Sequence, residues 1–442
     1  MMSTICAPTE AQVDISNRKS RFMELIQGTR DDSNLSTKDD DIISSMPNIV
    51  ITNIMNRLPI QDAIRTSILA RNWRLKWTTL TQLVFDKDFV QYLGERQEKQ
   101  DNVGDDNWYD EKNISGLFPH LMGPITKFVL TIPYGKVLDV KDFYDWVMFL
   151  SRKGIMEFTL ENNNKETVEL PTSIFSCRNL THLKLSNCHF PAAPPSFRGF
   201  QNLLSLDVSQ VTFASGFCDV ITMSPLLEIL KICDDEEPVP KVNLVDILKL
   251  KNLKVVSLPL YAIDSMEITN SLIVHGGPFL PNLEELFLSL AYFEGGVDVE
   301  EVISGKLLCD SFSRIKSLTL RYFDFDCSVM SPFVYEIIWG LPNLQTLTIY
   351  GSSDYEDRSL ELCTSMGQLQ LLNVVLEYFE GSKYELFFIK KLLACTPLLK
   401  KITIRPARYR HFDGHEEKFM VAKELLMFER ASTIAKVDLD MS

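Results

Sequence analysis

The amino-acid sequence predicts an α/β solenoid in which short parallel strands line one concave sheet and the segments between them return along the opposite side. Three observations predict this fold: an apolar template that recurs along most of the chain, an Asn-Leu dipeptide that holds a fixed place in the template, and a short helical segment ahead of the first repeat. The chain has 442 residues, which suggests two or three domains, but a repeat architecture is not bound by that count. We therefore expect a horseshoe preceded by a small all-α region.

The first 38 residues are expected to form a disordered tail. They are polar, contain few aromatic residues and include the polar run at 29–32. Such a composition buries too little apolar surface to offset the conformational entropy that ordering costs.

Residues 39–80 carry short apolar stripes that predict helices. Apolar residues recur at every fourth position between Val50 and Leu58, and Pro47 suits the first turn of a helix. A helix is therefore expected over 47–58, and it must end where Pro59 follows.

A second short helix is expected over 62–69, followed by a turn that holds Trp73 and Trp77. About 40 residues are too few to bury this apolar surface internally, since even domains of about 60 residues are marginal. The surplus apolar face is therefore expected to dock, either on another protein or on the solenoid as a terminal cap.

The repeats follow the template apolar-x-x-apolar-x-apolar. Twelve units match it, and after a first longer gap their starting residues lie 23 to 32 residues apart. This spacing fits one strand plus a helical or irregular return in each unit. The units start at Leu80, Ile125, Ile155, Leu180, Leu203, Leu227, Leu253, Leu283, Ile315, Leu344, Leu371 and Leu399.

The residues that flank the template fix its register. Asn-Leu opens five units, and Pro-Leu-Leu opens two others at the same place. The unit that begins at Leu180 continues with Leu183, Leu185, Asn187 and Cys188, which is very close to the leucine-rich repeat consensus. We therefore predict leucine-rich repeats over 81–370.

Template positions 1, 4 and 6 are expected to face the core, and positions 3, 5 and 7 the uncovered concave sheet. Aromatic and arginine residues dominate protein–protein hot spots, so Phe287, Arg321 and Tyr350, at positions 5, 7 and 7 of three consecutive units, are the candidate target-binding residues. In the competing interpretation Phe287 is covered by a neighbouring loop, and Arg321 is solvated beside an aspartate.

The charge of the chain argues against nucleic acid as a partner. The net charge is −14, whereas phosphate-backbone binding needs clustered basic groups. Residues 46–80 differ from the rest because they hold five basic residues and one acidic residue, a local charge of +4, which leaves −18 for the remainder. A basic, apolar, helical patch suits an acidic protein partner.

The chain shows no pattern of a secreted, membrane or catalytic protein. Nine cysteines without a C-x-x-C pair favour a reducing compartment, and no apolar stretch approaches 18 residues, so we expect a cytoplasmic and/or nuclear protein without membrane contact. His411 and His415 lie four apart, but no third metal ligand accompanies them. No phosphate loop, nucleophile elbow or pair of catalytic carboxylates is evident, so no cofactor, metal or enzymatic activity is expected.

The run from Asp41 to Trp77 resembles the F-box of plant F-box proteins. It holds D-I-I-S-S-M-P-N-I-V at 41–50 and R-T-S-I-L-A-R-N-W-R at 65–74, with Met46 and Ala70 standing where leucine and serine are common in the family. The resemblance implies binding to the small acidic Skp-type adaptor, which joins F-box proteins to a cullin and a RING subunit. The implied adaptor-binding residues are Met46, Pro47, Ile49, Val50, Ile54, Leu58, Pro59, Ala63, Ile68, Leu69, Arg71 and Trp73.

The rest of the chain resembles plant F-box/LRR/FBD proteins. The stretch 386–439 is similar to their FBD module, so the implied division is an F-box at 39–80, leucine-rich repeats at 81–370 and an FBD-like module at 371–442 that continues the repeats. The family implies a substrate-recognition subunit of an SCF-type cullin-RING ubiquitin ligase, with an unknown target protein on the repeats. The alternative is a ligase-independent scaffold whose helical end only caps the solenoid.

Overall fold

The structure is a computed structural model that divides into two compact units, which we treat in turn. The first unit holds the residues up to 202 together with 213–215, and the second holds 203–212 and the residues from 216 onward. The predicted tail at 1–38, Arg71 and His411 lie outside the described residues. The described residues are 46–69, 73–91, 114–136, 138–233, 238–264, 280–291, 314–327, 330–352, 367–407 and 415–440.

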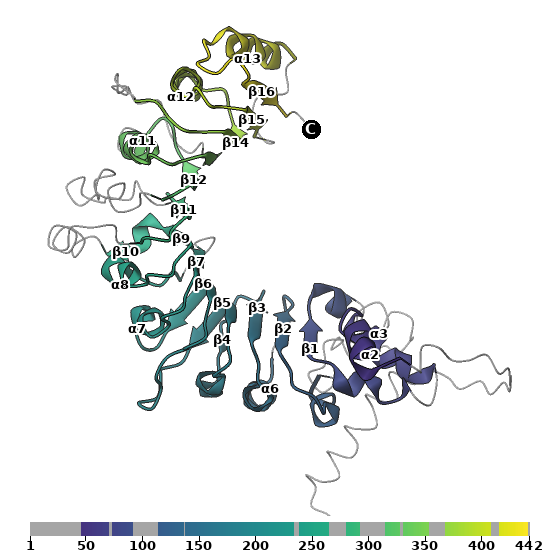
Figure 1. The fold of residues 1–442 in the computed structure, drawn as a ribbon. Helices are drawn as coiled ribbons and strands as arrows, with labels where there is room; N and C mark the ends of the chain where they lie inside the picture. The colour runs from purple at the N-terminus through teal and green to yellow at the C-terminus, as the bar shows by residue number, and fades with distance from the viewer. Residues whose placement is uncertain are drawn as a thin grey trace, which may run out of the picture. The chain divides into compact units, whose positions relative to one another are not determined.

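The first unit begins with short helices and continues as a parallel sheet in the strand order β1-β2-β3-β5, with β4 beside β5 (Figure 1). Its helical part comprises α2 (Asn48–Met55), α3 (Ile60–Arg65), η1 (Thr66–Ile68) and η3 (Lys76–Thr79). Its repeat part comprises β1 (Gln82–Phe85), η4 (Phe118–His120), β2 (Lys127–Ile132), α6 (Val140–Lys153), β3 (Glu157–Asn162), β4 (Val168–Glu169), η5 (Thr172–Ser176) and β5 (His182–Phe190).

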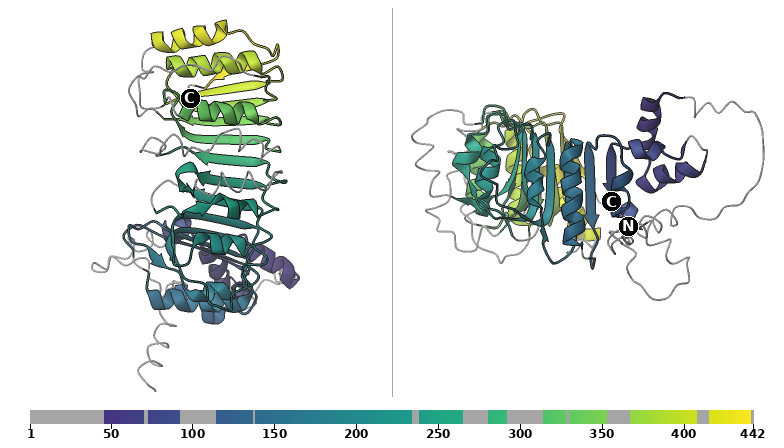
Figure 2. Two further views of the ribbon diagram at one scale, coloured as in Figure 1. Left: turned by 90° about the vertical axis from the view of Figure 1, so that its left-hand side faces the viewer. Right: turned by 90° about the horizontal axis from the view of Figure 1, so that it is seen from below.

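The second unit is a parallel sheet in the strand order β6-β7-β9-β11-β12-β13-β14-β15-β16, with a separate pair, β10 and β8. Its strands stack as successive rungs, and α7, α8, α11 and α12 lie along one face of them (Figure 1; Figure 2, left). Its elements are β6 (Ser205–Phe213), α7 (Phe217–Thr222), β7 (Ile229–Cys233), β8 (Val242–Asn243), α8 (Leu244–Leu248), β9 (Val255–Pro259), η6 (Leu260–Ala262), β10 (Ile263–Asp264), β11 (Glu285–Ser289), β12 (Ser317–Phe323), α11 (Met330–Gly340), β13 (Thr346–Gly351), β14 (Asn373–Phe379), α12 (Lys383–Cys395), β15 (Lys401–Pro406), α13 (His415–Met427) and β16 (Lys436–Leu439).

The predicted repeat register is confirmed. In all twelve predicted units the strand begins two residues after the template start. The side chains at template positions 1, 4 and 6 of these units are at most 4% exposed, so each unit buries its three apolar residues in the core. Neighbouring strands pair in parallel with equal template positions opposite each other, as Leu318 does with Leu286 and with Leu347. The α/β repeat fold and the helical start of the chain are therefore as predicted.

A ladder of asparagine side chains explains why Asn-Leu recurs. The asparagine directly before a template start donates its side-chain N–H to a backbone carbonyl of the preceding unit, at 3.0 Å in three units. A turn carbonyl that would otherwise need water is thereby paired in each of these three units. The three bonds run from Asn202 to Arg178, from Asn252 to Pro225 and from Asn282 to Lys251.

Two of the returning helices show ordinary start and stop signals. Helix α6 begins at Asp139, whose carboxylate accepts from the Lys141 N–H at 2.8 Å, and ends at Gly154, which adopts a φ of 81°. Helix α12 begins with a capping box, in which the Ser382 hydroxyl accepts from the Glu385 N–H and the Glu385 carboxylate from the Ser382 N–H.

The structure corrects several expected boundaries. The first helix spans Asn48–Met55 instead of 47–58, because residues 56–58 form turn bonds ahead of Pro59, and the second spans Ile60–Arg65 before it tightens into η1. Strand β16 was not predicted, although Ile434 opens a matching template. Three side chains at template position 7, expected to be open, are buried: Thr131, Pro259 and Ser289.

Candidate functional site

One side of helix α2 is polar and attaches the helical region to the start of the sheet. Asn48, Thr52 and Asn56 lie four residues apart, which places them along one side of the helix. They contact residues of η3 and of the segment that leads into β1, and we call these contacts the α2 ladder. Its members are Asn48–Lys76 at 2.9 Å, Thr52–Thr79 at 3.2 Å and Asn56–Thr81 at 2.8 Å.

A second side of α2 is apolar and buried. Ile51 and Met55 are at most 1% exposed. Trp77 of η3 is also buried, with its ring 5.8 Å from that of His120 in an edge-on arrangement. The helical region therefore has a small core of its own and is joined to the first repeats through η3.

Several other large apolar side chains of the helical region face solvent. Ile49 is 72% exposed, and Val50 and Ile54 of the same helix are exposed as well. Ile68 and Leu69, which follow α3, are exposed to a similar degree. Monomeric proteins rarely leave so many large apolar side chains of one small region in water, so this apolar face has the character of an interaction surface.

Basic side chains accompany the apolar face. Arg57 and Arg74 are exposed, and Lys76 is half-buried. Arg65 forms a surface ion pair with Asp62 at 3.2 Å. The local excess of positive charge seen in the sequence therefore lies in the same small region as the apolar face.

Most of the predicted adaptor-binding residues are accessible. Pro47, Ile49, Val50, Ile54, Pro59, Ile68 and Leu69 are exposed, and Met46 and Leu58 are half-buried. Ala63 and Trp73 are corrections: they are 0% and 6% exposed, because the region uses them for its own core, so they support the surface from behind and do not lie on it. Leu75, 61% exposed, was missed, because a single leucine outside a helical stripe carries no pattern.

The three candidate target-binding residues lie on three consecutive strands of the second unit. Phe287, Arg321 and Tyr350 belong to β11, β12 and β13, and all three are half-buried. Phe287 pairs with Thr319, two residues before Arg321, and Tyr350 pairs with Glu377 of β14.

The structure adds two exposed tyrosines to these candidates. Tyr322 and Tyr378 each stand at template position 8 and adopt left-handed backbone, with φ of 57° and 59°. The Arg321 guanidinium lies 5.2 Å from the Tyr322 ring, and the rings of Tyr350 and Tyr378 are 6.1 Å apart. We call these four residues the tyrosine cluster. No sequence pattern pointed to Tyr322 and Tyr378, because the apolar template ends at position 6 and leaves position 8 unspecified.

Left-handed backbone makes tyrosine an expensive choice at position 8. Tyrosine carries a Cβ that this conformation crowds, whereas asparagine and glycine adopt it at little cost, and Asn187 stands at the same position of an earlier unit with a φ of 52°. The side chain of Tyr378 is 54% exposed, so its packing does not offset the conformational strain of the left-handed backbone. Residues held in such conformations cluster at functional sites.

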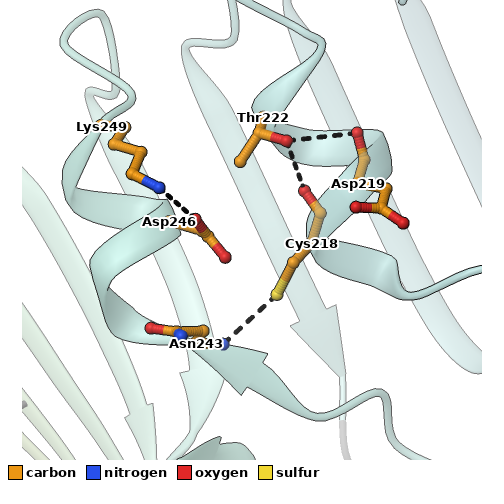
Figure 3. Close-up of polar contacts among 6 residues, drawn as sticks. All are labelled: Cys218, Asp219, Thr222, Asn243, Asp246 and Lys249. Atoms are coloured by element: carbon orange, nitrogen blue, oxygen red, sulfur yellow. Dashed lines mark hydrogen bonds and ion pairs between the residues drawn. The ribbon is translucent and has the colours of Figure 1, made fainter. Parts of the chain in front are cut away.

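Three of the described cysteines have the properties of structural thiols. Burial raises the pKa of Cys177 and of Cys188 to about 12. Burial also raises the pKa of Cys218, whose sulfur accepts from the Asn243 N–H at 3.4 Å, with Asp246 nearby (Figure 3). Such thiols remain protonated at neutral pH and are poor nucleophiles. Across the described residues, no three His, Cys, Asp or Glu side chains are grouped to hold a metal ion.

Two stretches of the chain match models of known protein families. Residues 43–83 match the model of the F-box domain, and residues 143–296 match that of the LRR repeats of the FBD-associated F-box protein At5g56370. Neither model is that of an enzyme. These matches confirm the predicted F-box, and they confirm leucine-rich repeats of the FBD-associated kind.

The chain is also similar to several curated proteins of a plant. F-box/FBD/LRR-repeat protein At1g13570 of Arabidopsis thaliana is 28% identical over 90% of this chain and 98% of its own length. F-box/LRR-repeat protein 13 of the same plant is 23% identical over 84% of this chain and 78% of its own length. Among solved structures, the LRR ectodomain of the Arabidopsis receptor kinase GASSHO1/SCHENGEN3 is similar with a TM-score of 0.31 and 14% identity, over 66% of this chain and 31% of that one. Within the described residues, no helix has the length and apolar character needed to cross a membrane.

Proposed function

We propose that this protein is the substrate-recognition subunit of an SCF-type cullin-RING ubiquitin ligase. Its F-box would bind the small acidic Skp-type adaptor, and through it the cullin and RING subunits, while the repeats bind a target protein. The observation that carries the proposal is the exposed apolar face of α2 and of the residues after α3, which lies within the F-box match and beside basic side chains. Such a surface suits an acidic partner with apolar pockets.

Such a subunit would act by holding the target protein close to the enzyme that carries ubiquitin. The F-box fixes one end of the chain on the ligase, the repeats hold the target, and a ubiquitin-charged enzyme brought by the RING subunit then meets a target lysine at high effective concentration. No covalent step is assigned to this chain. The six described cysteines are free thiols, which fits the reducing cytoplasm or nucleus where we place the protein.

On the target side, the tyrosine cluster and Phe287 are the proposed recognition surface. The strands β12, β13 and β14 place only uncharged side chains at template positions 3 and 5, next to the cluster. A charged group of the target would lose its hydration over these uncharged side chains and would gain no ionic partner from them. We therefore expect an uncharged segment of the target there. Tyrosine and arginine beside it supply large contact area and directional hydrogen bonds. The uncharged residues at these positions are Ser317, Thr319, Thr346, Thr348, Asn373 and Val375.

Adaptor binding is the decisive test of the function. Ile49→Ser combined with Ile54→Ser removes two exposed apolar contacts and should weaken binding of a purified Skp-type adaptor by about 2 kcal/mol or more, measured by calorimetry on the full chain. Ile434→Ser is the matched control, since Ile434 is an exposed isoleucine outside the F-box. A full chain that does not bind the adaptor, or a double variant that binds as tightly as wild type, would favour the alternative of a ligase-independent scaffold.

A further inference from the structure

The apolar and basic surface of the F-box does not stop where the F-box match ends. The segment that leads into β2 carries Met122, which is 74% exposed. No other large apolar residue in the described part of the first unit is more exposed. Met122 lies outside residues 43–83. It is nevertheless tied to the F-box, because its backbone N–H donates to the Thr78 carbonyl of η3 at 2.9 Å.

Leu75 lies between the F-box helices and Met122. The Leu75 carbonyl accepts from the Thr78 hydroxyl at 2.7 Å and from the Thr78 N–H at 3.2 Å. Leu75 and Thr78 are three residues apart in a tight turn, a rise of about 6 Å. The hydrogen bond from Met122 to Thr78 adds a few ångströms, so the backbones of Leu75 and Met122 lie within about 10 Å of each other. Both side chains are exposed.

The chemistry around Met122 repeats that of the F-box surface. Lys153, at the end of α6, directs its Nζ to the Leu121 carbonyl at 3.0 Å and lies 3.5 Å from the Met122 carbonyl. Arg74 and Lys76 flank Leu75 in the sequence. Exposed apolar side chains with basic neighbours therefore continue from the F-box onto the first repeats, in a chain whose net charge is −14.

The α2 ladder fixes helix α2 relative to η3 and to the segment that leads into β2. Its three contacts join α2 to η3 and to Thr81, and the Thr81 carbonyl in turn accepts from the Thr126 N–H at 2.7 Å, directly before β2. Side chains on α2, on η3 and ahead of β2 are thus held in a fixed relation. A partner that contacted α2, Leu75 and Met122 together would therefore meet backbone segments that are already fixed, and binding would not need to order them.

We infer that the adaptor-docking surface extends beyond the F-box through Leu75 to Met122 of the first repeats, so that the acidic Skp-type adaptor is held by the F-box and the start of the solenoid together. The inference rests on the proposed function, since it assigns more surface to the same partner. The basic groups Lys76 and Lys153 beside these side chains match the negative charge of that partner.

The test compares adaptor affinities of full-length variants by calorimetry with a purified Skp-type adaptor. Leu75→Ser combined with Met122→Ser should weaken binding about tenfold, and Met122→Ser alone at least threefold, because each removes an exposed apolar contact. Leu398→Ser and Met223→Ser are matched controls on exposed residues of the second unit and should leave the affinity unchanged. Unchanged thermal melting of all four proteins excludes misfolding as the cause.

The outcomes separate this inference from the function on which it rests. If Met122→Ser and the double variant bind within twofold of wild type while Ile49→Ser with Ile54→Ser loses binding, the surface ends at the F-box and the inference is wrong, although the function stands. If none of these variants affects binding, the proposed function fails as well. Equal weakening by the control variants would also overturn the inference, because the effect would then not depend on this surface.

Discussion

Successive residues of one strand contribute very differently to this protein, because their side chains point to opposite faces of the sheet. In β5, Leu183 is 1% exposed, whereas the adjacent Lys184 reaches across the open face to Glu161 of β3, with Nζ 2.7 Å from the carboxylate. The carboxylate also accepts from the Thr131 hydroxyl at 3.4 Å. The first side chain belongs to the core and the second to a polar surface network.

Truncation of these two neighbours should give unequal losses of stability. Leu183→Ala should lower the free energy of unfolding by about 2–5 kcal/mol, because it leaves a cavity between packed layers. Lys184→Ala should cost under about 1 kcal/mol, as for most exposed ion pairs. Urea denaturation of both variants measures the difference. Equal losses would contradict the register seen in the structure.

The Lys184–Glu161 pair should make stability depend on pH in a defined direction. The hydrogen bond from Lys184 holds the pKa of the Glu161 carboxyl below its ordinary value of 4.5. A carboxyl whose pKa is lowered by folding stabilises the protein above the ordinary pKa, and this contribution is lost as the pH falls through the lowered value. The stability difference between wild type and Lys184→Ala should therefore be present at pH 7 and vanish in acid.

A double-mutant cycle isolates this effect from other titrating groups. In a Glu161→Gln background, Lys184→Ala should change stability by an amount that no longer varies between pH 7 and acid, measured by urea denaturation at each pH. A difference that persists in acid with Glu161 present would show that the contribution of Lys184 is not electrostatic.

At the scale of elements, the asparagine ladder couples three of the units to the unit before them. In each ladder bond the asparagine side chain must donate an N–H, because its partner is a carbonyl oxygen, which can only accept. In the Pro-Leu-Leu units, Leu226 and Leu398 stand at the ladder position and are exposed. The ladder is thus a repeated local device, and the fold tolerates its absence in single units.

An isosteric substitution tests the ladder. Asn252→Asp keeps the shape but replaces the donor with a carboxylate that faces the Pro225 carbonyl, so the free energy of unfolding should fall by about 1–2 kcal/mol at pH 7. Part of the loss should be recovered in acid, where a protonated carboxyl can donate. Asn163→Asp is the control on an exposed asparagine outside the ladder, and thermal or urea denaturation measures both. Equal losses in the two variants would contradict a specific role for the ladder.

For the whole molecule, the proposed function assigns adaptor binding to the first unit and target binding to the second. The two should therefore be separable by mutation. Tyr322→Asn with Tyr378→Asn removes two exposed rings, while asparagine suits the left-handed backbone at both positions. Relief of backbone strain should offset the lost ring contacts, so the stability of the chain should change by less than about 1 kcal/mol.

This tyrosine variant should keep its affinity for the adaptor and lose its target. Proteomics of ubiquitinated proteins, with the variant replacing the wild-type chain, measures the effect: the proteins whose ubiquitination depends on the wild type should no longer be modified. Adaptor affinity by calorimetry is the internal control. If the same proteins remain ubiquitinated, the target binds elsewhere on the repeats or the C-terminal module.

The repeats and the F-box could both be predicted from sequence patterns. Positions 1, 4 and 6 could be assigned from the sequence because each unit must bury the same three apolar side chains, and the recurring Asn-Leu dipeptide marked the register. Met46 to Trp77 could be assigned because the F-box motif is contiguous. Both signals are local in the chain, so no tertiary knowledge was needed.

The tertiary structure was needed to show which side chains remain open to a partner. It buried Ala63 and Trp73 in the core of the F-box, and it exposed Leu75 and Met122, which lie 47 residues apart and meet through Thr78. It also turned the backbone at Tyr322 and Tyr378 so that these rings lie in solvent. Exposure depends on what other segments cover, and adjacency on how distant segments pack. Neither property is encoded in the spacing of apolar residues, which specifies only what each unit must bury.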